Sequence, residues 1–123
     1  MKFYGFALSE RLYIYPERHT ALFRFSLADQ QRFGVSGEDM EGLINYTLMI
    51  RDIEVGALVR EEVGRTKVSL RAKYDVDVNL LARQLGGGGH TKAAGATCYM
   101  TYPETLDAVE KLLGINNQTP LPQ

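Results

Sequence analysis

The chain has 123 residues, which is the size of one ordinary domain and long enough to bury a hydrophobic core. Hydrophobic residues make up 45% of it and charged residues 24%, values near the globular average that do not favour disorder. The net charge of -1 excludes a general electrostatic attraction of the whole chain for nucleic acid, and no apolar stretch is long enough to span a membrane.

Positive charge is nevertheless concentrated in one part of the chain. Residues 63–95 hold six cations and two anions, a local surplus of four. The cations are Arg65, Lys67, Arg71, Lys73, Arg83 and Lys92, and the anions are Asp75 and Asp77. Such a patch can attract anions whatever the overall balance, although any one of its cations can equally belong to a solvated face.

The single cysteine, Cys98, excludes an internal disulfide and is typical of a reducing compartment. Because it lies in an apolar stretch, we expect a buried, inert thiol rather than a nucleophile. The first residues lack the apolar run and cleavage site of a secretory signal, so we expect a cytoplasmic protein.

The first quarter of the chain predicts the end of a helix and then a hairpin. Residues 1–11 are weakly amphipathic, as at the end of a longer helix. Residues 12–15 and 21–25 read as two short strands, and residues 16–20 between them have turn chemistry.

Two capping signals follow, each a serine with an aspartate three residues later. Ser26 and Asp29 predict a short helix over residues 27–33. The second signal begins at Ser36 and predicts a helix that continues to about Met49.

The middle of the chain predicts two strands joined by a turn. In the first, residues 53–59, alternate apolar residues point to one side. In the second, Val68, Leu70 and Ala72 point into the core. The polar residues of this second strand share the opposite face: Lys67, Ser69, Arg71 and Lys73.

The last third predicts helix, strand and helix. Asp77 caps a helix over residues 78–85, whose apolar positions recur at helical spacing. Residues 94–100 read as a strand, Pro103 starts a final helix, and residues 115–123 are expected to form a loose tail. Intermixed strands and helices predict an α/β (α+β) fold in a single domain, with a mixed sheet of about five strands flanked by helices.

The glycine run at residues 86–89 carries the strongest chemical signal. Gly86 ends the preceding helix as a left-handed cap residue. Four glycines are costly to order, and a flexible linker fits poorly between an amphipathic helix and an apolar strand. A backbone that approaches a ligand and turns its N–H groups toward an anion explains the run better.

Side chains near this run can add to the binding of an anion. His90 can donate to a phosphate oxygen or stack on a base, and Lys92 adds charge. Arg71 can bind a phosphate through two parallel hydrogen bonds. The predicted phosphate-binding residues are Arg71, Gly87, Gly88, Gly89, His90 and Lys92.

The sequence contains no recognisable catalytic machinery. Its two histidines, His19 and His90, lie far apart without partners at the spacing of metal ligands. A phosphate-binding loop, a Ser-His-Asp signature and a cysteine pair for zinc are all missing. We therefore expect no catalytic residue, metal ligand or cofactor site in this chain.

The segment Gly86–Gly95 (GGGGHTKAAG) resembles the signature of the DHH-associated C-terminal domain of DHH phosphoesterases. The likeness is greatest to bacterial oligoribonucleases that also remove the 3′-phosphate of phosphoadenosine phosphate. It extends over roughly residues 26–113, in which further segments follow the family's order: residues 41–46, 55–61, 68–73 and 76–78. Asn45 matches a recurrent position without a firm role.

The resemblance implies boundaries within this chain and separate domains for substrate binding and for catalysis. Residues 26–114 would be the DHH-associated substrate-binding domain. Residues 1–25 would be its start, or the end of an interdomain linker helix plus a hairpin, and residues 115–123 a C-terminal tail. An active site would lie between two domains, where a DHH domain holds two Mn²⁺ ions and the second domain binds the phosphate and terminal base. The family's binding residues fall on Arg71, Gly87, Gly88, Gly89 and His90.

We therefore expect a nucleotide-binding part of a manganese-dependent exonuclease or phosphodiesterase that is inactive by itself. Its partners would be short RNA or DNA oligonucleotides, or nucleotides such as phosphoadenosine phosphate. A DHH catalytic domain, in the same longer protein or in a separate chain, would supply the hydrolase chemistry. A homodimer is compatible with this expectation, and no membrane partner is expected.

Three alternatives remain open from the sequence. A substrate domain for cyclic dinucleotides also carries a GGGGH run, although the Ala-Ala-Gly ending and short loops favour oligonucleotides. A non-catalytic dimerisation or interaction module, as in alanyl-tRNA synthetases, usually has arginine after the glycines, so His90 argues against it. A phosphatase of polyphosphate or pyrophosphate has a different basic motif.

Overall fold

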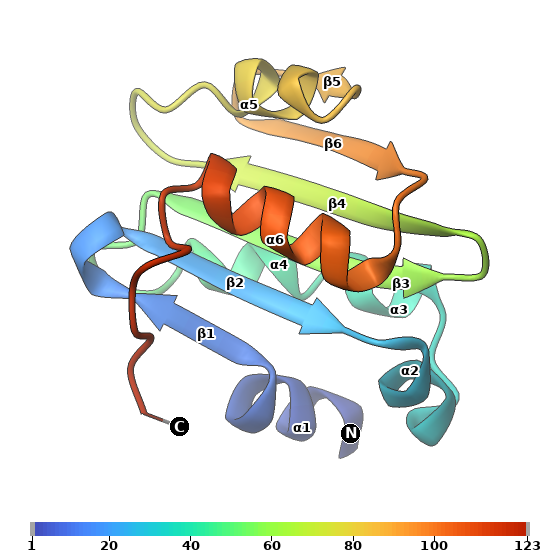
Figure 1. Ribbon diagram of the computed structural model, residues 1–123. Helices are drawn as coiled ribbons and strands as arrows, with labels where there is room; N and C mark the ends of the chain where they lie inside the picture. Colours follow the sequence, from blue (N-terminus) through green and yellow to red (C-terminus); the bar gives the residue numbers. More distant parts are fainter. Residues whose placement is uncertain (1, 123) are drawn as a thin grey trace.

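The computed structural model describes residues 2–122 as one mixed sheet with helices on both of its faces (Figure 1). The helices are α1 (Lys2–Glu10), α2 (Leu27–Phe33), α3 (Gly37–Glu41), α4 (Ile44–Thr47), α5 (Val78–Gln84) and α6 (Tyr102–Leu112), with a 3-10 turn, η1, at Pro16–Arg18. The strands are β1 (Leu12–Tyr15), β2 (Thr20–Phe25), β3 (Val55–Glu62), β4 (Arg65–Ala72), β5 (Gly88–Gly89) and β6 (Ala93–Cys98).

The strands lie in the order β1-β2-β3-β4-β6-β5. Only β2 and β3 pair in parallel, and the other neighbours are antiparallel. A parallel pair needs a crossover connection, which the segment with α2, α3 and α4 provides. This arrangement confirms the predicted α/β (α+β) class with a mixed sheet. The sixth strand, β5, comes from the glycine run itself, for which the sequence predicts only a ligand-binding loop.

Two hydrophobic cores fill the two faces of the sheet. One lies under α5 and α6 and includes Ala57 and Val59 of β3, while the other lies under α1 to α4 and includes Leu58. Figure 1 shows α6 crossing the front of the sheet and α3 and α4 behind it. We had expected β3 to bury one side only. Because helices cover both faces, this central strand is apolar on both.

The predicted helix from Ser36 to Met49 is instead two short helices, α3 and α4, separated by a turn at Gly42 and Leu43. Glycine weakens a helix interior, and the break lets Met40, Leu43 and Ile44 all enter the second core. The α4 helix lies close to the sheet. Its Thr47 Oγ1 occupies the space that a Cβ atom at Gly56 of β3 would need.

The capping signals at the helix starts are confirmed. Ser26 and Asp29 form a reciprocal capping box at α2, and Asp77 accepts from the backbone at the start of α5. Pro103 lies in the first turn of α6, as expected. Thr101 and Glu104 form a capping box there that we did not predict.

The expected loose tail is wrong for part of its length. Ile115 is 1% exposed and belongs to the first core, and the N–H of Leu121 donates to the carbonyl oxygen of Ile14 on β1 at 2.9 Å. Cys98 is buried, and burial raises the pKa of its thiol, as expected of an inert cysteine. None of the helices in residues 2–122 is long and apolar enough to cross a membrane. The boundaries given above for the domain and its flanking segments stay a prediction.

Candidate functional site

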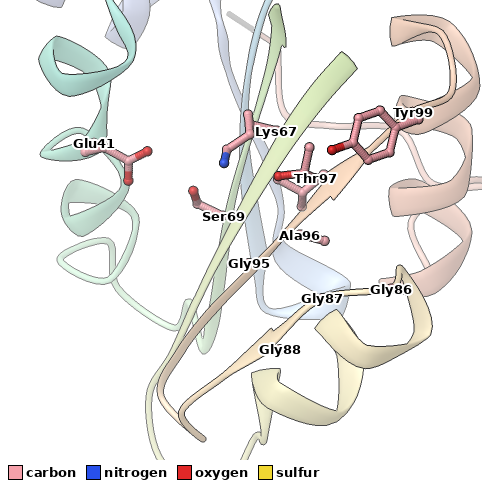
Figure 2. Close-up of a pocket in the computed structure, with 11 residues that line it drawn as sticks. Glu41, Lys67, Ser69, Gly86, Gly87, Gly88, Gly95, Ala96, Thr97 and Tyr99 are labelled. Atoms are coloured by element: carbon pink, nitrogen blue, oxygen red, sulfur yellow. The ribbon is translucent and has the colours of Figure 1, made fainter. Parts of the chain in front are cut away.

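A polar groove of about 580 Å³ lies beside the glycine run, on the face of the sheet that also carries α3 and α4 (Figure 2). It is lined by Glu41, Lys67, Val68, Ser69, Gly86, Gly87, Gly88, Gly95, Ala96, Thr97 and Tyr99. These residues come from α3, β4, β6 and the segment that contains β5. Residues that are far apart in the chain therefore meet in one hollow.

Strand register explains the floor of the groove. Ser69 of β4 lies opposite Gly95 of β6, and Gly95 lies opposite Gly88 of β5. This row crosses three strands with one short side chain, so the floor is low there. One step along, Lys67 lies opposite Thr97, and both side chains stand on the same face as Ser69.

Most of the glycine run is required by the chain's own geometry. Gly86 has φ 85° and Gly89 has φ 152°, values that side chains disfavour. A Cβ at Gly87 would overlap the carbonyl oxygen of Gly95 and lie 2.7 Å from Cα of Ala96. Gly88 is the least restricted, since its nearest neighbour would be Asn79 Oδ1 at 3.3 Å.

The N–H groups of the run are mostly used inside the protein. Gly86 and Gly87 donate to carbonyl oxygens of α5 at 3.0 and 2.9 Å, and Gly89 donates to Asn79 Oδ1 at 2.9 Å. His90 donates to the carbonyl oxygen of Ala93 at 2.8 Å. Our interpretation of the run as a set of N–H donors turned toward an anion is therefore wrong for Gly86, Gly87 and Gly89. Their role is to pack a thin strand against α5 and β6. The predicted role of the His90 side chain stays a prediction.

The predicted binding residues fall into two groups. Gly87 and Gly88 line the groove, whereas Arg71, Gly89, His90 and Lys92 do not. The second group gathers at one end of the same strands. Arg71 lies opposite Ala93, whose backbone pairs with that of His90, and the carbonyl oxygen of Lys92 accepts from the N–H of Ala72 at 3.0 Å. His90 and Lys92 are exposed there.

The cations on this face differ in their partners. Arg60 and Arg65 are both paired with Glu62, Arg65 at 2.6 Å. Burial alone would raise the pKa of Glu62, but hydrogen bonds from Arg65 and Arg60 outweigh it and lower that pKa. Within residues 2–122, neither Lys67 nor Arg71 has a carboxylate within ion-pair distance. In the part of the chain that the structure describes, Arg71 donates one side-chain hydrogen bond, to the carbonyl oxygen of Leu70, so both cations keep donors for a ligand.

Five side chains of the groove were not among the predicted binding residues: Glu41, Lys67, Ser69, Thr97 and Tyr99. Lys67 and Ser69 were already on the predicted polar face with Arg71, so alternation along β4 was a usable signal. Glu41 begins the segment 41–46 that resembles the family, but that likeness did not place it at the groove, because it approaches from a helix positioned by tertiary packing. No group of three or more His, Cys, Asp or Glu side chains able to hold a metal ion occurs among residues 2–122.

A known protein family matches the part of the chain that contains the groove. The DHHA1 domain pattern matches residues 21–114, which contain every predicted binding residue. The chain belongs to the DHHA1 domain family. DHHA1 domains generally accompany a DHH catalytic domain in phosphoesterases.

Two of the similar proteins are much longer than this chain. NrnA of Thermus thermophilus, a bifunctional oligoribonuclease and PAP phosphatase, is 36% identical over 81 residues, which are 62% of this chain and 24% of that protein. An exopolyphosphatase-related protein of Bacteroides fragilis has a TM-score of 0.85 at 30% identity, over 92% of this chain and 33% of that one. The chain thus spans about a quarter of the curated relative it matches.

A more distant structure shares the fold alone. The pGpG-specific phosphodiesterase PggH of Vibrio cholerae has a TM-score of 0.62 at 16% identity, over 94% of this chain and 38% of that one.

Proposed function

We propose that this DHHA1 domain binds short oligonucleotides or nucleotides through their phosphates and presents them to a DHH catalytic domain for hydrolysis. The observation that carries the proposal is the polar groove with Lys67 on its floor and Arg71 at the end of the same strand face, both without a carboxylate partner in residues 2–122. The matching family and the oligoribonuclease relative support phosphate esters of nucleosides as the ligand class.

Each group in the groove or at its Arg71 end has a distinct role in this proposal. Arg71 binds a phosphate through its planar guanidinium, and Lys67 provides a point charge for the next phosphate along the strand. The hydroxyl groups of Ser69 and Thr97 can donate to phosphate or sugar oxygens. The low glycine floor lets the sugar and base lie close to the sheet, and His90 offers a ring at the Arg71 end.

Cleavage belongs to another part of the assembly in this proposal. Residues 2–122 do not supply a metal-binding set, so two Mn²⁺ ions would be held by a DHH domain of the same longer protein or of a separate chain. Such ions activate water and stabilise the charge that develops on the phosphate. This chain's own contribution is to position the phosphate and to neutralise part of its charge.

The proposal is tested by titrating 5′-phosphorylated diadenylate into the chain and its Lys67→Ala, Arg71→Ala and His90→Ala variants. Losing a charge-assisted hydrogen bond costs about 1.5–3 kcal/mol, so Kd should rise roughly ten- to a hundredfold for Lys67→Ala and Arg71→Ala. Binding by the wild type should also weaken with salt, with a slope of log K against log salt of about -0.7 per neutralised phosphate.

Matched controls come from cations elsewhere on the surface. Lys111→Ala removes a lysine of α6 that pairs with Asp107, and Arg83→Ala removes an exposed arginine of α5. Both should bind like the wild type. An unchanged Kd in both Lys67→Ala and Arg71→Ala contradicts the site. Phosphodiesterase activity of this chain alone with Mn²⁺ contradicts the division of labour.

A further inference from the structure

Glu41 contributes the only carboxylate among the residues that line the groove. It stands on the α3 wall, while Lys67 and Ser69 rise from the strand floor. Figure 2 shows the ends of the Glu41 and Lys67 side chains turned toward the same hollow. A negative charge beside a phosphate site repels the ligand, so its presence there needs a chemical reason.

The fold holds Glu41 in this position. The Arg60 guanidinium lies under α3, its side chain is 10% exposed, and it pairs with Glu62 of the same strand. A Cβ atom at Gly37 would sit 2.7 Å from that guanidinium, so the first turn of α3 packs directly on Arg60. At the other end of this short helix, Glu41 Oε1 lies 3.8 Å from Arg60 Nη2.

The Glu41 carboxylate keeps its capacity to accept hydrogen bonds. The Arg60 contact is an ion pair that is too long for a hydrogen bond. Within residues 2–122, no backbone or side-chain group donates a hydrogen bond to Glu41. A carboxylate only accepts, so a ligand group that meets it favourably must be a donor.

The sugar of a ribonucleotide offers that donor. Phosphates in the groove would lie with Lys67, and the hydroxyl next to the glycosidic bond is the group that distinguishes RNA from DNA. Acidic side chains bind ribose hydroxyls in the same way in dinucleotide-binding folds. We propose that Glu41 accepts a hydrogen bond from the 2′-hydroxyl of a nucleotide in the groove and makes this domain select RNA over DNA. This inference rests on the proposed function.

The test compares two probes that differ in one atom per sugar: 5′-phosphorylated diuridylate and its 2′-deoxy counterpart with the same bases. Each is titrated into the wild type, Glu41→Ala, Glu41→Gln and Glu38→Ala. Any contact to a base contributes equally to both probes, so the ratio of their Kd values reports the sugar contact alone. Glu38 lies on the same helix, lines a different hollow and is absent from the groove, so Glu38→Ala removes the same charge without the contact.

The wild type should bind the ribose probe about tenfold more tightly, as expected from one charge-assisted hydrogen bond. The ratio should fall to about one in Glu41→Ala, because the ribose probe then loses the hydrogen bond of its 2′-hydroxyl, whereas the loss of the repelling charge affects both probes equally. It should be intermediate in Glu41→Gln, which keeps an acceptor and the shape of the side chain, and unchanged in Glu38→Ala.

The two failures can be told apart. A wild-type ratio of about one, or an unchanged ratio in Glu41→Ala with binding retained, overturns the role of Glu41 alone. If neither probe binds the wild type, the proposed function and this inference fail together. If Glu41→Ala loosens α3, Glu41→Gln still tests the contact, because its side chain keeps the shape that packs against Arg60.

Discussion

Neighbouring glycines of the run differ in what a side chain would meet. Gly87 packs on the backbone of β6, so an added methyl group collides with atoms that cannot move without breaking the sheet. At Gly86 the space is open and only the positive φ opposes a side chain. Gly5 of α1 has neither restriction.

These differences predict an ordered series of stabilities. Gly87→Ala should lower the free energy of unfolding by about 3 kcal/mol, the upper end for overpacking. Gly86→Ala should cost about 1 to 2 kcal/mol through backbone strain. Gly5→Ala should stabilise by about 0.5 to 1 kcal/mol, as in any exposed helix interior. Urea unfolding of the three variants checks the series, and equal losses at Gly86 and Gly87 would contradict the close packing of Gly87 on β6.

The sequence could identify some residues of the site for physical reasons. Alternation along β4 predicts that Lys67, Ser69 and Arg71 share a face, because neighbouring side chains in a strand point to opposite sides. The reasons for each glycine could not be predicted, since they depend on which strand lies alongside. Glu41 could not be predicted either, because its place is set by Arg60 under α3.

At the level of elements, α1 and α2 are joined by one ion pair. Arg11 binds both carboxylate oxygens of Asp29 at 2.9 and 3.0 Å, and Asp29 also accepts from the N–H of Ser26 in the α2 cap. Burial alone would raise the pKa of Asp29, but the hydrogen bonds from Arg11 and Ser26 outweigh it, and the pKa of Asp29 is lowered. The start of α2 is therefore coupled to the end of α1 through a charge that depends on pH.

A lowered folded-state pKa has a defined effect on stability. The contribution of the Asp29 carboxylate to the free energy of unfolding is fully present above its unfolded pKa of about 3.9. It is lost as the pH falls through the lower pKa of the folded state. Arg11→Ala should therefore lower the free energy of unfolding by roughly 1 to 2 kcal/mol near neutral pH, a value between those of exposed and of buried ion pairs. The loss should be much smaller near about pH 2. Denaturant unfolding at the two pH values measures this.

Arg32→Ala is the matched control for that pH dependence. The Arg11 guanidinium lies over the Phe6 ring, 4.6 Å from its centroid, and that of Arg32 lies over the same ring at 5.2 Å. Arg32, however, takes part in no ion pair within residues 2–122. Its effect on stability should be the same at both pH values. A cost of Arg11→Ala that does not shrink in acid would show that the cation supports α1 through packing rather than through Asp29.

Helix starts were predictable because a cap is a local interaction within four residues, as at Ser26 with Asp29. The break at Gly42 was not, since an isolated glycine is tolerated in many helices and only the sheet beneath decides whether the chain must turn. The pairing of β5 was missed for the same reason. Two glycines have no strand pattern of their own and become a strand only beside β6.

At the scale of the whole molecule, the two cores make α1 part of the folded unit. Phe3, Phe6 and Ala7 are buried together with Phe23, Phe25 and Leu58 from the sheet. The helix therefore covers one end of the second core, while its exposed side carries Leu8, which is 42% exposed.

Phe6→Ala should accordingly destabilise the whole domain by about 3 to 5 kcal/mol, as for other buried phenylalanines. Leu8→Ala, on the exposed side of the same helix, should change stability by less than about 0.5 kcal/mol. Equilibrium unfolding of each variant should show one transition, at the same midpoint by circular dichroism and by tyrosine fluorescence. A separate early transition in Phe6→Ala would mean that α1 folds apart from the rest.

The two ends of the sheet leave little for another chain to extend. At one edge, β5 has only two residues, both glycines. At the other, β1 has four residues, and the N–H of Leu121 already occupies the carbonyl oxygen of Ile14 in its middle. A long, open edge strand is a template on which further copies of a protein add and aggregate. With one edge this short and the other hydrogen bonded to Leu121, residues 2–122 leave no long, open edge strand of this kind.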